Sequence, residues 1–224
     1  MSVQTASYIE AIEHLPKGAI LRLPHVSWED YEQLLADLGD DYHVRVSYAC
    51  GWLEIMSPLP EHEEFAEVVL GITREITREL GVKLETRGSM TIRSAWQAQG
   101  AEPDTCFYVQ SAARIIGKRS LDFNTDPPPD IVVEIDITNV SQSKFPIYAA
   151  LGVSEIWRYD GSQAYFYHLA GEQYIEMSHS QAFPFLSSTV LAQFIEQSKT
   201  EGQDAALDAA REWVRVHKQD SPMT

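Results

Sequence analysis

The sequence has few cysteines and few basic residues. Its two cysteines, Cys50 and Cys106, do not form a CxxC pair, which excludes a disulfide-rich scaffold and a zinc finger. The 17 Lys and Arg residues face 33 Asp and Glu residues, so the formal net charge is -16. This charge disfavours broad, non-specific binding of nucleic acid, but it permits a small site that binds a phosphate through metal ions.

Long hydrophobic runs are missing as well. No apolar stretch approaches the roughly 20 residues that cross a membrane, and the first residues lack the pattern of a signal peptide. We therefore expect a protein with no membrane partner that works in the reducing cytoplasm. The length and ordinary apolar content predict a single domain over residues 1–224.

Two segments carry clear helical signals. Ser27 is a typical N-cap, with Asp30 three residues later, and Gly39 is a typical helix stop. Over residues 61–80, apolar side chains recur at helical spacing until Gly81. Further helices are predicted at 143–151, 189–198 and 204–217.

Short segments rich in β-forming residues lie between these helices. Residues 42–49 and 52–56 predict a hairpin that turns at Cys50-Gly51, and residues 95–100 are expected to form a loop. Further strands are predicted at 82–86, 90–93, 105–109, 131–137, 155–159, 164–168 and 173–177. This order of elements predicts an α/β (α+β) fold with a mixed β-sheet flanked by helices.

The most apolar of these strands carries acidic residues on one face. Alternation places Val132, Glu134 and Asp136 on the same side, and neighbours two apart lie roughly 6.5–7 Å from each other. Two buried acids at that separation repel when both are ionised, and a bound cation removes the repulsion. Asp104, which opens another strand, adds a third carboxylate.

Carboxylate oxygens of this kind suit Mg²⁺ or Mn²⁺, which can polarise a phosphodiester and activate a water molecule. The ordinary interpretation is that acids at strand ends are solvated. The apolar residues around Glu134 and Asp136 argue against it, because exposed strands are rarely so apolar.

Two basic residues lie where they could act with these acids. Lys144 opens a short helix, where a cation opposes the helix dipole, so we expect it to orient a water or neutralise a phosphate. His62 lies in the first turn of the 61–80 helix beside Glu61, and both are expected to face inward and contact the substrate or a second ion. The alternatives are a lysine that points to solvent and a histidine at the edge of the core.

Four segments share features with a known family: Leu53–Glu63, Glu102–Asp104, Pro129–Asp136 and Lys144–Asp160. Together they resemble the Uma2-type restriction-endonuclease family, which is abundant in cyanobacteria and belongs to the PD-(D/E)XK nuclease superfamily. The resemblance implies a restriction-endonuclease-like core over about residues 28–195. An N-terminal hairpin and a C-terminal helical extension over about 188–218 would be added to that core.

The resemblance also implies a site for a metal ion. Asp104 corresponds to the first acid of the superfamily pattern and Glu134 to the acid of the (D/E)XK element. Both would hold Mg²⁺ (or Mn²⁺), together with the backbone carbonyl of Ile135. Asp136 stands where the lysine usually lies, so it would be a third ligand or an acceptor beside the metal. Family members often carry the lysine on the next helix, which here is Lys144.

We therefore expect a metal-dependent endonuclease that hydrolyses phosphodiester bonds of DNA. A catalytically inactive relative that binds a nucleic acid or protein partner is an alternative, favoured by the negative charge and by Asp136 in place of lysine. A paired-carboxylate glycosidase is a weaker one, because no aromatic platform is evident around the acids.

Many DNA-cutting enzymes of this fold pair two sites, so a homodimer is expected by analogy. Two apolar patches at helical spacing could form its interface, and core packing explains them equally well. The patches consist of Leu191, Phe194 and Ile195, and of Leu207, Ala210 and Val214.

Overall fold

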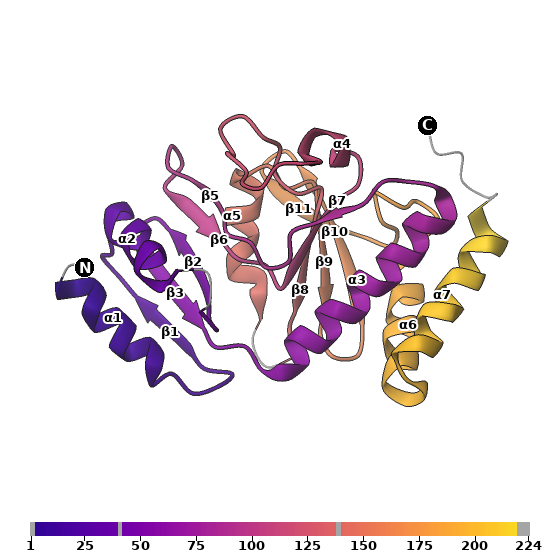
Figure 1. Cartoon of the computed structure of the whole chain (residues 1–224), viewed down its shortest axis with the longest axis horizontal. Coiled ribbons are helices and arrows are strands. Elements are labelled where there is room, and N and C mark those ends of the chain that lie inside the picture. Colours follow the sequence, from indigo (N-terminus) through magenta and orange to yellow (C-terminus); the bar gives the residue numbers. More distant parts are fainter. Residues whose placement is uncertain (1–2, 40–41, 138–139, 219–224) are drawn as a thin grey trace.

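The computed structural model in Figure 1 describes residues 3–39, 42–137 and 140–218, and they form two β-sheets with helices around them. The first sheet is antiparallel, in the order β1 (Ile20–Leu23), β3 (Trp52–Met56), β2 (Arg45–Ala49), β6 (Gln99–Ala101) and β5 (Ile92–Ser94). The second has the order β11 (Gln173–Met177), β10 (Ala164–Ala170), β9 (Glu155–Tyr159), β8 (Ile131–Ile135), β7 (Thr105–Tyr108) and β4 (Glu85–Thr86). Its central pair, β8 and β9, is parallel and its other pairs are antiparallel, so the sheet is mixed.

The helices cover these sheets from several sides (Figure 1). Their bounds are α1 (Val3–Glu13), α2 (Trp28–Leu38), α3 (Pro60–Leu80), α4 (Ala112–Ile115), α5 (Phe145–Ala150), α6 (Ser188–Glu201) and α7 (Gln203–His217). A 3₁₀ turn, η1 (Ser141–Lys144), leads into α5. Helices α1 and α2 lie on the outer side of the first sheet, whereas α3, α6 and α7 pack against the second. The expected mixed α and β fold is confirmed. The predicted hairpin, however, belongs to a five-stranded sheet that the sequence did not predict.

Helix α3 is the longest element, and residues typical of helix ends stand at both of its ends. Pro60 occupies its first turn, and Gly81 ends it in the left-handed conformation with φ 68°. Phe65, Val69 and Ile72 belong to the buried stripe that the sequence predicts. Burying each such side chain stabilises the fold by roughly 1.5–3 kcal/mol.

The two faces of β8 have different neighbours. Ile131, Val133 and Ile135 belong to the core that α3, α6 and α7 cover. Val132 packs instead with Ile147 and other residues of the α5 side. The predicted alternation is therefore confirmed, and Glu134 lies on the face that α5 covers.

The apolar patches of the C-terminal helices are used inside this chain. Their buried members, which include Leu191, Ile195 and Val214, pack into the same core as α3, and Leu207 lies against Gly71 of α3. Core packing thus accounts for both patches, and the expected homodimer draws no support from them. None of the helices in the described residues is long and apolar enough to span a membrane.

The N-terminal region contains elements that the sequence did not predict. Helix α1 and strand β1 were not expected, and β6 occupies part of the segment predicted to be a loop. Gly100 in β6 shows why local pattern was a poor guide, because a Cβ there would lie 2.3 Å from the Tyr31 hydroxyl. Close packing against α2 therefore selects glycine, a residue with low β-propensity.

Candidate active site

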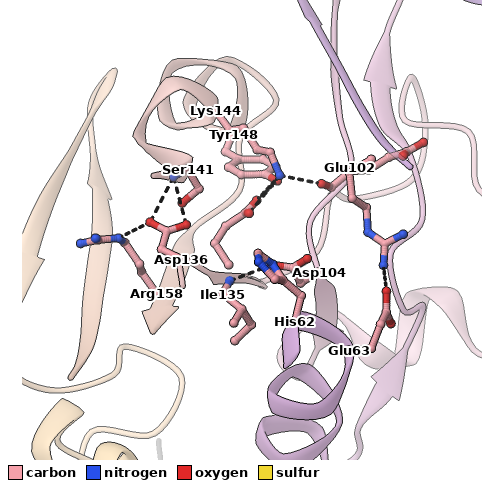
Figure 2. Close-up of polar contacts among 12 residues, drawn as sticks. His62, Glu63, Glu102, Asp104, Ile135, Asp136, Ser141, Lys144, Tyr148 and Arg158 are labelled. Carbon is pink, nitrogen blue, oxygen red and sulfur yellow. Dashed lines mark hydrogen bonds and ion pairs between the residues drawn. The ribbon is translucent and has the colours of Figure 1, made fainter. Parts of the chain in front are cut away.

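Five residues from separate elements meet at the edge of β8, on its α5 side (Figure 2). Asp104 precedes β7, Glu134 lies in β8, His62 is in the first turn of α3, Lys144 ends η1 and Tyr148 lies in α5. All five are at most 5% exposed. The structure thus brings together four of the predicted site residues, with Tyr148 as a fifth member.

Asp104 is held by the backbone of β8 through one of its oxygens. Its N–H donates to the Val133 carbonyl at 3.1 Å, and its Oδ2 accepts from the Ile135 N–H at 2.7 Å. The other oxygen, Oδ1, is buried without a hydrogen-bond partner among the residues that the structure describes. A buried carboxylate oxygen left unsatisfied is costly, so this one is open to a ligand.

His62 lies beside Asp104 with both ring nitrogens open. Its Nδ1 is 3.7 Å from Asp104 Oδ2, which is beyond hydrogen-bond distance, and neither nitrogen has a partner within the described part of the chain. The expected inward position is confirmed for His62. It is wrong for Glu61, whose side chain is exposed, because the helix surface turns about 100° per residue and Glu61 falls on the side that its neighbours leave uncovered.

Glu134 is surrounded by hydrogen-bond donors. Lys144 Nζ lies 2.9 and 3.1 Å from its two oxygens and also donates to the Glu102 carbonyl at 3.0 Å. The Tyr148 hydroxyl donates to the same carboxylate. The three protons of the ammonium therefore have three acceptors, two of which belong to Glu134.

Burial and nearby charge shift the pKa values of these groups. Burial raises the pKa of Glu134 to about 7, Asp104 adds to the rise, and Lys144 and Tyr148 oppose it. Burial alone would lower the pKa of Lys144, but Glu134 and Asp104 outweigh it and the net shift is upward. The pKa of Tyr148 lies well above its ordinary value because of burial and Glu134. Lys144 is thus charged and Tyr148 protonated at neutral pH, while Glu134 titrates near it.

Asp136 has a different set of partners. Both of its oxygens accept from the Ser141 N–H at 3.0 Å, Oδ2 also accepts from Arg158 Nε, and its own N–H donates to the Tyr159 carbonyl. Figure 2 shows Asp136 facing Ser141 and Arg158, whereas Asp104 lies beside His62. Asp136 therefore anchors η1 and β9 to the end of β8 in this structure.

Tyr148 and Arg158 are the polar partners that the sequence did not reveal. Tyr148 lies four residues after Lys144, a spacing that places both on one face of a helix, so it could have been found. Arg158 depends on the parallel register that pairs it with Glu134 across β8 and β9. The carbonyl of Glu102 is a backbone group, so its contact with Lys144 could not be predicted from residue type.

Two cavities are lined by chain neighbours of the site residues. One, of about 620 Å³, is lined by Lys17, His43, Arg45 and Glu63, and Glu63 directly follows His62. Arg45 is only 8% exposed and forms an ion pair with Glu63. An arginine side chain can bind a phosphate in such a cavity.

The second cavity, of about 350 Å³, lies on the Lys144 side. Trp52, Glu54 and Ser143 are among the residues that line it.

The residues present fit a hard divalent cation. The described residues contain no group of three His, Cys, Asp or Glu side chains placed to hold a metal. Mg²⁺, however, is commonly held by one or two carboxylates and keeps several waters. Asp104 Oδ1 and Glu134 supply two carboxylates, and the Ile135 carbonyl points to the same edge of the strand as the Ile135 N–H that binds Asp104.

Comparison with known proteins finds a matching family and a similar solved structure. The Uma2 family model, described as "Putative restriction endonuclease", matches residues 28–197, a range that contains all five site residues. A crystal structure from Anabaena variabilis, described as "a putative nuclease belonging to DUF820", is 14% identical with a TM-score of 0.47. The match covers 81% of this chain and 99% of that one. No curated protein matches.

Proposed function

Since the chain belongs to the Uma2 family of restriction-endonuclease-like proteins, we propose that it is a metal-dependent endonuclease that hydrolyses phosphodiester bonds of DNA. One observation carries the proposal. Asp104 Oδ1 is buried without a described partner beside a second buried carboxylate, Glu134, and a charged lysine, Lys144. Two carboxylates and a lysine in this arrangement are what metal-assisted phosphodiester hydrolysis requires.

Asp104, Glu134 and the Ile135 carbonyl would hold Mg²⁺ or Mn²⁺. When bound, the ion polarises the phosphate and lowers the pKa of a water. It also removes the repulsion between two neighbouring carboxylates, which contributes to the raised pKa of Glu134.

Lys144 positions the reacting groups. Because it donates twice to the same carboxylate, a ligand that takes one Glu134 oxygen releases an N–H for a water or a phosphate oxygen. The Tyr148 hydroxyl keeps Glu134 in place during this exchange. His62, with both nitrogens open, contacts a phosphate oxygen or the attacking water.

Purified protein should cut plasmid DNA with Mg²⁺ or Mn²⁺ and lose cutting when EDTA is added. Glu134→Gln should abolish cutting, because it removes a negative ligand at nearly constant volume. Glu67→Gln, on the exposed face of α3, is the matched control and should cut like the unaltered protein. Equal cutting by Glu134→Gln and the control would sink the assignment.

A second function, binding of a partner without catalysis, is supported by a specific contact. Lys144 already occupies both oxygens of Glu134, and an ion must displace it. Titration calorimetry with Mn²⁺ separates the two functions. Uptake that disappears in Asp104→Asn supports the endonuclease, whereas no uptake by the unaltered protein supports the binding module.

A further inference from the structure

The cavity of about 350 Å³ lies between the first sheet and the segment that carries Lys144. Its sheet wall includes Arg22 of β1, Ser47 of β2, and Trp52 and Glu54 of β3. Its other wall is formed by Ser143 and Ile147. Trp52 is 56% exposed, so part of its indole is open to a ligand.

The cavity lies near the residues of the proposed site, to which two of its lining residues are joined in the chain. Ser143 and Ile147 each precede a site residue in the chain, Lys144 and Tyr148. Glu54 is also among the charges that raise the pKa of Lys144, so the two side chains lie within electrostatic reach. A molecule in the cavity would therefore lie near Lys144.

The charges of the cavity favour a neutral occupant. Arg22 Nε and Glu54 Oε2 form an ion pair at 2.6 Å, so their charges offset each other. The Glu54 side chain is 17% exposed, and the balanced pair offers no net positive charge to attract a phosphate. A planar group that stacks on indole and donates a hydrogen bond to a carboxylate suits such a cavity.

We propose that this cavity, the base pocket, receives one unpaired nucleobase of the DNA strand, stacked on Trp52 next to the scissile phosphate. The Glu54 carboxylate accepts a hydrogen bond from an exocyclic amino group, which cytosine and adenine carry and thymine lacks. A base can enter only after it leaves the helical stack, so the substrate is single-stranded or locally unpaired DNA. This inference depends on the proposed function for the identity of its ligand.

The test measures binding without cutting. Fluorescence anisotropy of a labelled (dC)₁₂ or (dT)₁₂ oligonucleotide is followed in EDTA, where the nuclease reaction cannot proceed. Trp52→Ala should weaken (dC)₁₂ binding about tenfold, because that is the typical effect of losing a stacking aromatic. Trp52→Phe should restore most of the affinity. Trp96→Ala is the control, since Trp96 is 92% exposed and does not line the cavity.

Base selection gives a second measurement. The unaltered protein should bind (dC)₁₂ more tightly than (dT)₁₂, and Glu54→Leu should reduce that preference. Arg22→Leu, which removes only the partner cation, should keep it. Inorganic phosphate should compete much less than deoxycytidine.

Several results would overturn the inference. They are no binding by the unaltered protein, equal losses in Trp52→Ala and Trp96→Ala, equal binding of both oligonucleotides, or competition by phosphate alone. Failure of the base pocket is distinguishable from failure of the proposed function. If the unaltered protein cuts DNA and Trp52→Ala still binds (dC)₁₂ normally, the protein is a nuclease without this pocket. If the protein never cuts DNA but the Trp52 and Glu54 variants change oligonucleotide binding as expected, the base pocket stands and the proposed nuclease function fails.

Discussion

Glu134 and Asp136 are two residues apart in the chain, yet their surroundings differ in kind. Glu134 accepts hydrogen bonds from a lysine and a tyrosine, and it lies near a second carboxylate, Asp104, one oxygen of which has no described partner. Asp136 accepts hydrogen bonds from the Arg158 guanidinium and a backbone N–H, and neither of these groups titrates near neutral pH. The first cluster can change its protonation and accept a ligand, whereas the second is complete as it stands.

A third carboxylate shows that burial alone does not mark a site. Glu155 is 1% exposed and burial raises its pKa, as for Glu134. Its oxygens, however, accept from the Trp157 indole and from the Gln181 and Ala182 N–H groups. The partners, more than the depth, separate a carboxylate that joins two segments from one that is placed for chemistry.

The largest expected effect tests the chemical cluster. Asp104→Asn should lower DNA cutting at least about a hundredfold, as loss of a charged group that stabilises the transition state typically does. Circular dichroism and thermal unfolding should stay close to those of the unaltered protein, because the amide oxygen can still accept from the Ile135 N–H. A variant that cuts normally would show that Asp104 is structural, like Asp136.

The structural cluster should respond in the opposite way. Arg158→Met leaves the Asp136 carboxylate buried without its cation, and this should lower the free energy of unfolding by about 3 kcal/mol. Urea denaturation measures the loss. The ion pair of the exposed Arg215 with Glu79 supplies the control, since solvent screens this pair and Arg215→Met should lower the stability much less than Arg158→Met does. Similar losses in both variants would remove the distinction between the two carboxylates of the strand.

The pH dependence of stability should isolate Glu134. Its pKa is raised from 4.5 to about 7 in the folded state, so the folded protein holds this proton more tightly. The resulting stabilisation is complete below pH 4.5 and is lost as the pH rises through 7. In EDTA, unaltered protein should therefore lose up to about 3 kcal/mol relative to Glu134→Gln between pH 4.5 and 8. Parallel urea-denaturation profiles for the two proteins would contradict the assigned surroundings.

The smallest effect is expected at Tyr148. Tyr148→Phe removes one hydrogen bond to Glu134 and leaves both Lys144 contacts. Cutting should fall by less than about tenfold, because a single hydrogen bond to a charged group contributes about 1.5–3 kcal/mol and part is recovered by Lys144. The pH profile of cutting should shift upward, since a donor that favours the ionised carboxylate is lost. An unchanged profile would make Tyr148 a packing residue.

The site was more predictable than its surroundings. Asp104, Glu134, Lys144 and His62 were predicted from their residue types and motifs, and the structure brings them together. Glu61 was misplaced, because a helical wheel cannot tell which of two flanking residues the neighbouring sheet will cover. Two strands of the first sheet were missed, since β1 and β6 are short and each has a partner that is distant in sequence.

The sequence by itself determined the alternation of β8, the apolar stripe and ends of α3, and the supply of carboxylates and a lysine, because these depend on local period and residue type. Only the tertiary structure decided which partners Glu134 and Asp136, on one face of the strand, would have. The parallel register with β9 brings Arg158 to Asp136, and the entry of β7 brings Asp104 to the Ile135 N–H. Contacts between distant segments set which charges are neutralised and which stay open, and no local pattern encodes them.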